Sequence, residues 1–399
     1  MSPALLSIVL TALLLCVAAP ALAACAYLLC LTLWSARLPA LRHTRTVPRF
    51  DIVVPAHDEA AVIGRCLASL HRLDWPAQRL QLIVLADNCN DATAAVARGC
   101  GVRVIVRDDQ GQQGKGYALQ RAFNDSLAAS WADAVVIVDA DTQVSADLLQ
   151  GFAAAMDRGA GVGQARYGVL NAAESWRTGL MAIAHGAFHD LRSQARERLR
   201  LSCGIRGNGW FVTHDVLRQV PYAALSLTED LEYGITLGLA GHRVHYVAAA
   251  RVDAVMESSE AVARRQRQRW EDGRLALMTS QVGPLLRAAV VRRSAVCLDL
   301  ALDLLVLPLS YVACNLLLLA VLAAVASIWV PALMVWCAVA AGGAAVLVVY
   351  VLRGWQLSGR GAAGLLDLIR APWFVLWKLL TLLRPHDRRR WTPTRRRDS

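Results

Sequence analysis

The sequence has no Cys-x-x-Cys pair, although its 399 residues include 10 cysteines. The cysteines are scattered and several lie in long apolar segments, which argues against a zinc site built from sulfur and indicates reduced, packed thiols. A Walker-type phosphate loop is also missing, because Gly116 follows Lys115 where Ser or Thr is required, and Asp109 stands where the first glycine should be. ATP binding through such a loop is therefore not expected.

Charged residues are absent from residues 3–34, and only Asp299 and Asp303 interrupt the apolar segment 298–352. The content of 56% hydrophobic residues exceeds that of an ordinary soluble domain. Since about 20 helical residues cross a bilayer, we predict one span in the first segment and two in the second. Residues 22–25 resemble a cleavage box, but no basic region precedes them, so an uncleaved signal-anchor is expected.

The net charge of +11 does not indicate nucleic-acid binding, because no recognised binding module accompanies it. The arginines cluster beside the apolar segments instead, which is typical of the positive-inside bias. We therefore predict a multi-pass protein of the inner (plasma) membrane with its soluble part in the cytoplasm. Residues 371–383 are too short for a typical span and predict an interfacial helix, although a fourth span is the alternative. The predicted regions are an anchor at 1–36, a soluble domain at 37–293, two spans within 294–353, and an interfacial helix with a basic tail at 354–399.

The soluble region has the pattern of a doubly covered, mainly parallel α/β sheet. Short β-rich runs lie at residues 50–55, 82–86, 102–106 and 134–138, and helical spacing separates the first two. Ligands of such sheets collect at the carboxyl ends of the strands. Polar residues follow three of these strands at 55–59, at Asp87, and at Asp139 and Asp141, so we expect one cleft.

Two carboxylates separated by one residue directly after a buried strand can both face the cleft. Buried carboxylates are costly unless paired or bound to metal, and hard divalent cations prefer oxygen ligands. Asp139 and Asp141 are therefore predicted to bind Mg²⁺ or Mn²⁺ together with a diphosphate. Further along the chain, Thr228-Glu229-Asp230 precedes an apolar helical stripe, and residues 266–270 read Gln-Arg-Gln-Arg-Trp.

Through these motifs, in this order, residues 51–270 resemble the inverting family-2 glycosyltransferases, which include cellulose, chitin and hyaluronan synthases and ceramide glucosyltransferase. The resemblance implies a Rossmann-like GT-A domain that binds a nucleotide sugar, flanked by transmembrane helices. Residues 55–59 read Pro-Ala-His-Asp-Glu and depart from the commoner Pro-x-Tyr-Asn-Glu of that family.

The resemblance also implies roles for individual residues. Asp230 would be the general base, and Asp87 would contact the uracil of a UDP-sugar. Each of these two acids has a plainer interpretation as a helix N-cap. The predicted donor-binding residues are Pro55, His57, Glu59, Asp87, Lys115, Asp139, Gln266 and Arg269, and the predicted acceptor-binding residues are Gly209, Glu229 and Trp270.

Two further alternatives remain open from the sequence. Lys115 could belong to a plain turn, and residues 264–270 could form a solvated basic face. Asp299 and Asp303 are costly facing lipid and either line an acceptor path or pack against other helices.

The expected function is transfer of a sugar to a lipid-linked or growing saccharide acceptor. A processive synthase working alone is the first alternative, and a non-catalytic scaffold with polysaccharide-export partners is the second.

Overall fold

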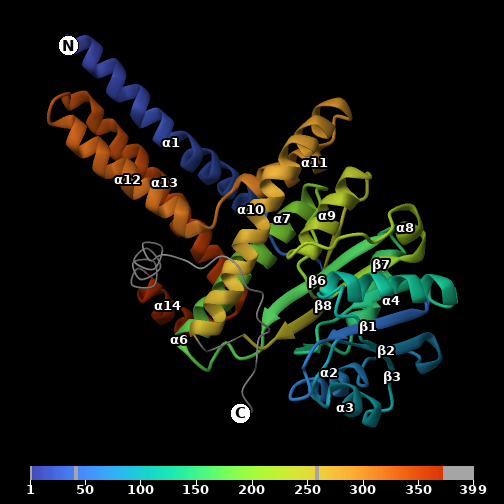
Figure 1. The fold of residues 1–399 in the computed structure, drawn as a ribbon. Coiled ribbons are helices and arrows are strands. Elements are labelled where there is room, and N and C mark those ends of the chain that lie inside the picture. Colours follow the sequence, from blue (N-terminus) through green and yellow to red (C-terminus); the bar gives the residue numbers. More distant parts are fainter. Residues whose placement is uncertain (1, 40–43, 257–259, 372–399) are drawn as a thin grey trace.

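The computed structural model describes residues 2–39, 44–256 and 260–371. An eight-stranded sheet in the order β3-β2-β1-β4-β7-β6-β8-β5 forms the centre of the soluble region (Figure 1). The strands β1 to β4 pair in parallel, as predicted, whereas β7 runs antiparallel to β4 and β6. The strands are β1 (Phe50–Ala56), β2 (Leu80–Asp87), β3 (Arg103–Arg107), β4 (Ala134–Ile137), β5 (Thr142–Val144), β6 (Val162–Val169), β7 (Trp210–Thr213) and β8 (His245–Ala254).

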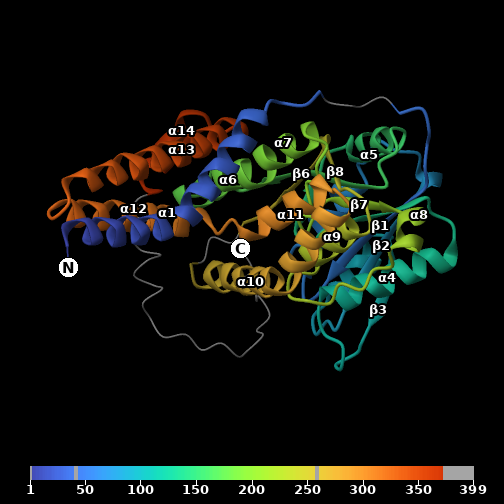
Figure 2. The same cartoon turned by 90° about the horizontal axis from the view of Figure 1, so that it is seen from above.

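All four strands predicted from the sequence are present, although β4 ends one residue earlier than expected. Successive side chains of a strand point to opposite faces, so β1 supplies both cores: Ile52 and Val54 pack on one face and Val53 on the other. Short helices cover the two faces of the sheet (Figure 2). One face carries α2 (Ile63–Leu70), α3 (Thr93–Gly99) and α5 (Leu148–Met156), and the other carries α4 (Lys115–Ala129), α8 (His214–Gln219) and α9 (Glu229–Leu239).

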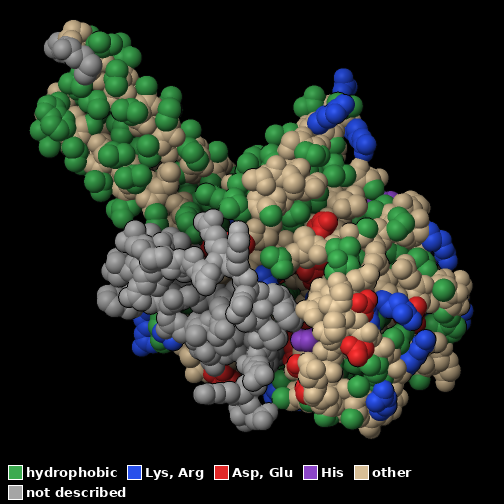
Figure 3. Space-filling view, in the orientation of Figure 1, with side chains coloured by type: hydrophobic (Ala, Val, Ile, Leu, Met, Phe, Trp, Pro, Cys, Tyr) green, Lys and Arg blue, Asp and Glu red, His purple; other side chains and the backbone are tan. Residues whose placement is uncertain are grey.

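Within the part of the chain that the structure describes, three helices are long and apolar enough to cross a membrane, and together they form a bundle beside the sheet (Figure 1). Their outer surface is covered by hydrophobic side chains (Figure 3). The segment 298–352 does contain two of these helices, but the first begins at Leu309 because α11 (Ala295–Leu305) ends before Pro308. The bundle consists of α1 (Pro3–Trp34), α12 (Leu309–Ser327) and α13 (Val335–Ser358), with the short helix η3 (Pro331–Met334) before α13.

A group of helices joins this bundle to the sheet. Gly186 and Gly354 allow close approach, since a Cβ on Gly186 would lie 2.3 Å from the Gly354 carbonyl oxygen. Leu191 and Ala195 are fully buried against residues of α1 and α13, including Leu28. The connecting helices are α6 (Trp176–His185), the π-helix η2 (Gly186–Leu191), α7 (Arg192–Arg198) and α10 (Glu260–Val291).

The remaining elements are the short helix η1 (Ala77–Arg79) and α14 (Gly361–Ile369), which packs against α6. The interfacial helix predicted at 371–383 lies outside the described residues, apart from Ala371.

Candidate active site

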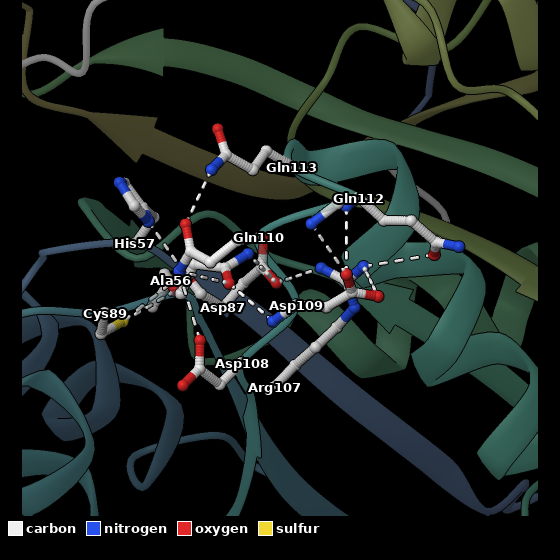
Figure 4. Close-up of polar contacts among 12 residues, drawn as sticks. Ala56, His57, Asp87, Cys89, Arg107, Asp108, Asp109, Gln110, Gln112 and Gln113 are labelled. Carbon is white, nitrogen blue, oxygen red and sulfur yellow. Dashed lines mark hydrogen bonds and ion pairs between the residues drawn. The ribbon is translucent and has the colours of Figure 1, made fainter.

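The carboxyl ends of β1, β2 and β3 meet in a polar cluster around Asp87 (Figure 4). The His57 Nδ1 donates a hydrogen bond to the Asp87 carbonyl oxygen at 2.8 Å. The Asp87 carboxylate is buried and pairs with Arg107, whose Nη1 lies 2.5 Å from Oδ1. Asn88 accepts the backbone N–H of Asp109 at 2.8 Å, so the loop after β3 closes over the loop after β2.

Asp87 does not cap the helix that follows it. The N-cap of α3 is Ala92, and the Asp91 carboxylate, one residue earlier, accepts the backbone N–H of Thr93 at 2.8 Å. Asp87 is thus placed at the end of β2 rather than at a helix end, while Pro55 lies within β1 and the Glu59 N–H donates to Thr93 Oγ1 at 2.8 Å.

Arg107 was not identified from the sequence. Its partnership with Asp87 arises because the parallel register of β2 and β3 places the two residues opposite each other, a contact with no local sequence signal.

A second cluster lies around Lys115, at the first position of α4. The Lys115 Nζ is 2.5 Å from Asp139 Oδ1, 2.9 Å from the Gly207 carbonyl oxygen and 4.0 Å from Glu229 Oε1. One ammonium therefore links the loop after β4, the loop before β7 and the start of α9, which makes a plain turn an insufficient account of Lys115.

Carboxylates outnumber cations in this cluster. Burial lowers the pKa of Lys115, but Asp139 and Glu229 raise it by more, so the net shift is upward. Burial raises the pKa of Asp139. The charge of Lys115 lowers this pKa in part, and the charge of Asp141 raises it further. Burial likewise raises the pKa of Glu229, to about 7, and that of Asp230. The acids are therefore held in a state that favours gain of a proton or of a cation.

The Asp230 carboxylate faces the loop at 204–209. Thr228 is the N-cap of α9, so the interpretation of Asp230 as the cap is wrong, and Asp230 lies within the first turn. Gly207 has φ +84° and passes so close that a Cβ there would lie 3.2 Å from Asp230 Oδ2. Only glycine combines this left-handed backbone with this approach.

Asn208 is a fully buried residue that connects this loop to the predicted metal ligands. Its Oδ1 accepts the Asp139 backbone N–H at 3.0 Å, and its Nδ2 donates to Thr142 Oγ1 at 2.7 Å. The next residue, Gly209, has φ +68° and abuts Val252 of β8, where a Cβ would overlap the valine at 2.5 Å. Asn208 was not predicted individually, although the Gly-Asn-Gly sequence that contains it marks a turn.

Residues 266–270 lie in the helix α10, as their spacing predicted. The structure does not describe the side chain of Gln266. The side chains of Arg269 and Trp270 are exposed. One turn further on, a Cβ on Gly273 would lie 2.6 Å from Thr228 Cγ2, so α10 abuts the start of α9. The helix face that carries Trp270 and Gly273 is therefore close to the acidic residues of α9.

The Asp139 and Asp141 pair fits a hard divalent cation. Both residues supply carboxylate oxygens after β4, and their mutual repulsion contributes to the raised pKa of Asp139. Among the described residues, Asp58, Cys89 and Asp91 also bring three ligand atoms close together, but Asp91 already accepts hydrogen bonds from Thr93 and Ala60. Asp139 is likewise paired, with Lys115, so both groups are candidate cation sites.

Comparison with known proteins identifies the class to which this fold and this site belong. Residues 48–273 match the family model described as "Glycosyltransferase like family 2". Because the match covers more than half of the 399 residues, the chain belongs to glycosyltransferase family 2.

Two curated relatives are similar over the same region. The beta-monoglucosyldiacylglycerol synthase of Synechocystis sp. is 30% identical over 240 residues, covering 57% of this chain and 48% of the relative. The probable glycosyltransferase YdaM of Bacillus subtilis is 25% identical over 238 residues, covering 57% and 56%. The chain thus spans about half the length of these relatives.

A solved structure resembles almost the whole chain. The mannosyltransferase PcManGT of Pyrobaculum calidifontis, in complex with GDP-Man and Mn²⁺, aligns over 94% of this chain and 99% of its own. The TM-score is 0.54 at 16% sequence identity, a likeness that establishes the fold. The GT-A fold predicted from the sequence is therefore confirmed, including its flanking apolar helices.

Proposed function

We propose that the protein is an inverting glycosyltransferase that transfers a sugar from a UDP-sugar to a lipid-linked or saccharide acceptor at the cytoplasmic face of the inner membrane. The observation that carries this proposal is the position of Asp230. Its carboxylate adjoins the Gly207 turn, whose carbonyl oxygen receives the same Lys115 ammonium that pairs with Asp139. A base and a diphosphate site are thus neighbours.

The donor would lie along the carboxyl ends of the strands. Asp87, with His57, Pro55 and Glu59 nearby, would hold the uracil end, and Lys115 would reach the diphosphate. Asp139 and Asp141 would hold Mg²⁺ or Mn²⁺, which when bound offsets the negative charge of the departing diphosphate. Gln266 and Arg269 of α10 would contribute further diphosphate contacts, for which the planar guanidinium of Arg269 is suited.

Transfer requires one proton to move and one bond to replace another. The Asp230 carboxylate takes the proton of the acceptor hydroxyl, whose oxygen bonds to the anomeric carbon while the bond from that carbon to the diphosphate breaks. Attack from the side opposite the diphosphate inverts the anomeric centre. Glu229 and Gly209 would border the acceptor, and Trp270 would offer its indole face to a sugar ring.

The flanking helices support a membrane-bound acceptor. Three candidate spans pack on the same connecting helices that border the sheet, and a single chain with so few spans supplies few walls for a polymer channel. A relative named as a glycolipid synthase also favours a lipid acceptor. The proposed regions remain the anchor 1–36, the catalytic domain 37–293, the spans of 294–353 and the cytoplasmic tail 354–399.

The test is transfer of radiolabel by purified protein in membrane extract, with a panel of UDP-sugars and GDP-mannose as donors. Chromatography then separates lipid-sized from polymeric product. We expect a lipid-sized product from one UDP-sugar, lost on metal chelation and in Asp230→Asn. A polymeric product would favour a processive synthase, whereas UDP binding with no transfer from any donor would favour a scaffold of an export assembly.

A further inference from the structure

Asp303 of α11 lies among four arginine side chains between the membrane bundle and the sheet. Its exposed fraction is 4%. The carboxylate is 3.0 Å from Arg192 Nη1, 2.7 Å from Arg196 Nη2 and 3.9 Å from Arg206 Nη1. The fourth arginine, Arg274 of α10, donates to the Asp303 carbonyl oxygen and, at 3.0 Å, to that of Val306.

Two of these arginines belong to the walls of the candidate active site. Arg206 directly precedes Gly207, the turn residue that faces Asp230. Arg274 directly follows Gly273, the α10 residue that abuts Thr228 at the start of α9. Asp303 therefore contacts Arg206 of the loop through its carboxylate and Arg274 of α10 through its backbone carbonyl.

The other side of the cluster belongs to the membrane helices. The Arg192 Nε donates to the Tyr350 hydroxyl of α13 at 2.8 Å. Asp299, one turn before Asp303, accepts hydrogen bonds from Arg196 at 2.9 Å and from the Tyr27 hydroxyl of α1 at 2.8 Å. In both views, α7, α10 and α11 lie between the bundle and the sheet (Figures 1 and 2).

The cluster holds four guanidinium groups and two carboxylates, so the loss of one carboxylate has a large effect. Arg206 Nε and Nη2 and Arg274 Nε have no hydrogen-bond partner although they are buried. The Arg206 side chain is instead held by the Phe188 ring, 4.8 Å from its Cζ, and by the Asp303 carboxylate. Without that carboxylate, Arg206 would lose the ion pair that the described residues give it in this cluster.

We propose that Asp303 is a positioning residue for the catalytic site, whose carboxylate holds the 204–209 loop in place through Arg206. The expected effect on kcat rests on the proposed function, whereas the expected effect on the 204–209 loop does not. The sequence left open whether Asp299 and Asp303 line an acceptor path or pack between helices, and the contacts of both residues are those of packing. Asp303 differs from Asp299 in that its contacts lead into the active site.

The chain offers a matched pair for the test, Asp303→Asn and Asp299→Asn. Both acids are 4% exposed, lie on the same helix and pair with Arg196. We expect Asp303→Asn to lower kcat by about ten- to hundredfold, because small displacements of catalytic groups have effects of this size. The KM for the UDP-sugar should stay within about twofold, because the Asn variant keeps the backbone carbonyl that holds Arg274 of α10, and the residues proposed for the uracil lie on the far strands β1 to β3. Asp299→Asn should lose a similar amount of thermal stability while keeping kcat within about threefold.

A second measurement does not depend on activity. Amide hydrogen exchange of residues 204–209 should increase in Asp303→Asn and remain as in the wild type in Asp299→Asn. If Asp303→Asn does not fold, Asp303→Glu keeps the charge but moves it, and the same comparison applies with a smaller loss of kcat.

Three results have distinct meanings. Equal losses of kcat and equal exchange in the two Asn variants would overturn the positioning role, since both acids would then serve stability alone. A rise in the donor KM without a change in kcat would overturn it as well. A wild-type protein that transfers no sugar would overturn the proposed function, while unequal exchange in the two variants would still support the positioning role.

Discussion

Two charged clusters in this protein, one half-buried and one buried, have opposite compositions. Around Lys115 the active site gathers three carboxylates, those of Asp139, Glu229 and Asp230. The second cluster lies between the apolar bundle and the sheet, around Asp303, and is called the joint below. It contains two carboxylates, those of Asp299 and Asp303, and four guanidinium groups, those of Arg192, Arg196, Arg206 and Arg274. The site has an excess of acid, and the joint has an excess of arginine.

The difference in composition suits the acid-rich cluster to proton transfer and metal binding and the arginine-rich cluster to holding helices together. Carboxylates in excess repel one another, and their pKa values rise until a proton or a cation enters, which is what metal binding and base catalysis both use. Arginine remains protonated at any pH that a protein tolerates, so an arginine-rich cluster cannot exchange protons. It can only hold the elements that contribute to it, provided its few acids stay in place.

The largest effect is expected from Asp230→Asn, which removes the proposed base. We expect kcat to fall by about 10² to 10⁴, the range that general bases supply. Thermal stability should not fall, because the substitution removes a buried charge from an acid-rich cluster. Asp215→Asn is the matched control, since Asp215 is 87% exposed at the side chain. Near-normal turnover of Asp230→Asn in the transfer assay would exclude Asp230 as the base.

Breaking the joint should instead affect stability. Arg196→Met leaves Asp299 without its arginine, and removal of one partner of a buried ion pair typically costs about 3–5 kcal/mol. Thermal unfolding in detergent measures this loss, with Arg218→Met as the exposed control. A stability equal to that of the wild type would show that the joint has no architectural role and would remove the contrast between the two clusters.

Acidification should distinguish the clusters within one protein. Because burial raises the pKa of Glu229 to about 7 and raises that of Asp230, both gain protons as pH falls through these values. A base that must be ionised is then lost, so kcat/KM should decline about tenfold per pH unit below the raised pKa of Asp230.

The joint should not unfold over the same change, because its arginines do not titrate and they hold the pKa of Asp303 well below its usual range, although burial raises the pKa of Asp299. Near-UV circular dichroism recorded between about pH 7 and pH 5 should therefore remain constant while the activity declines. A decline in activity that begins only near the ordinary pKa of an aspartate, about 3.9, would contradict the raised pKa of Asp230.

The smallest effect is expected at the Gly207 turn. Gly207→Ala should cost about 1–2 kcal/mol of stability from its left-handed backbone and should also lower kcat severalfold by displacing Asp230. Gly241→Ala is a matched control, because Gly241 has φ +93° with nothing within 4 Å of its Cβ position. Equal kcat values in the two variants would show that the approach of Gly207 does not position the carboxylate.

The strands and spans could be predicted because they depend on local patterns. Periodicity located β1 to β4, and the absence of charge located α1 and the apolar pair α12 and α13. The first of that pair begins later than predicted because Asp299 and Asp303 belong to a separate helix, and apolar content cannot separate two helices that follow each other.

The sequence by itself determined the strands β1 to β4, the long apolar helices and the order of the acidic motifs, since each depends on neighbouring residues. Only the tertiary structure decided which charges meet: Arg107 with Asp87, Lys115 with Asp139, and Asp303 with Arg196 and Arg206. These partners are brought together by strand register and helix packing, which depend on the whole chain. A buried charge is compensated by whichever group the fold brings near it, and no local spacing specifies that group.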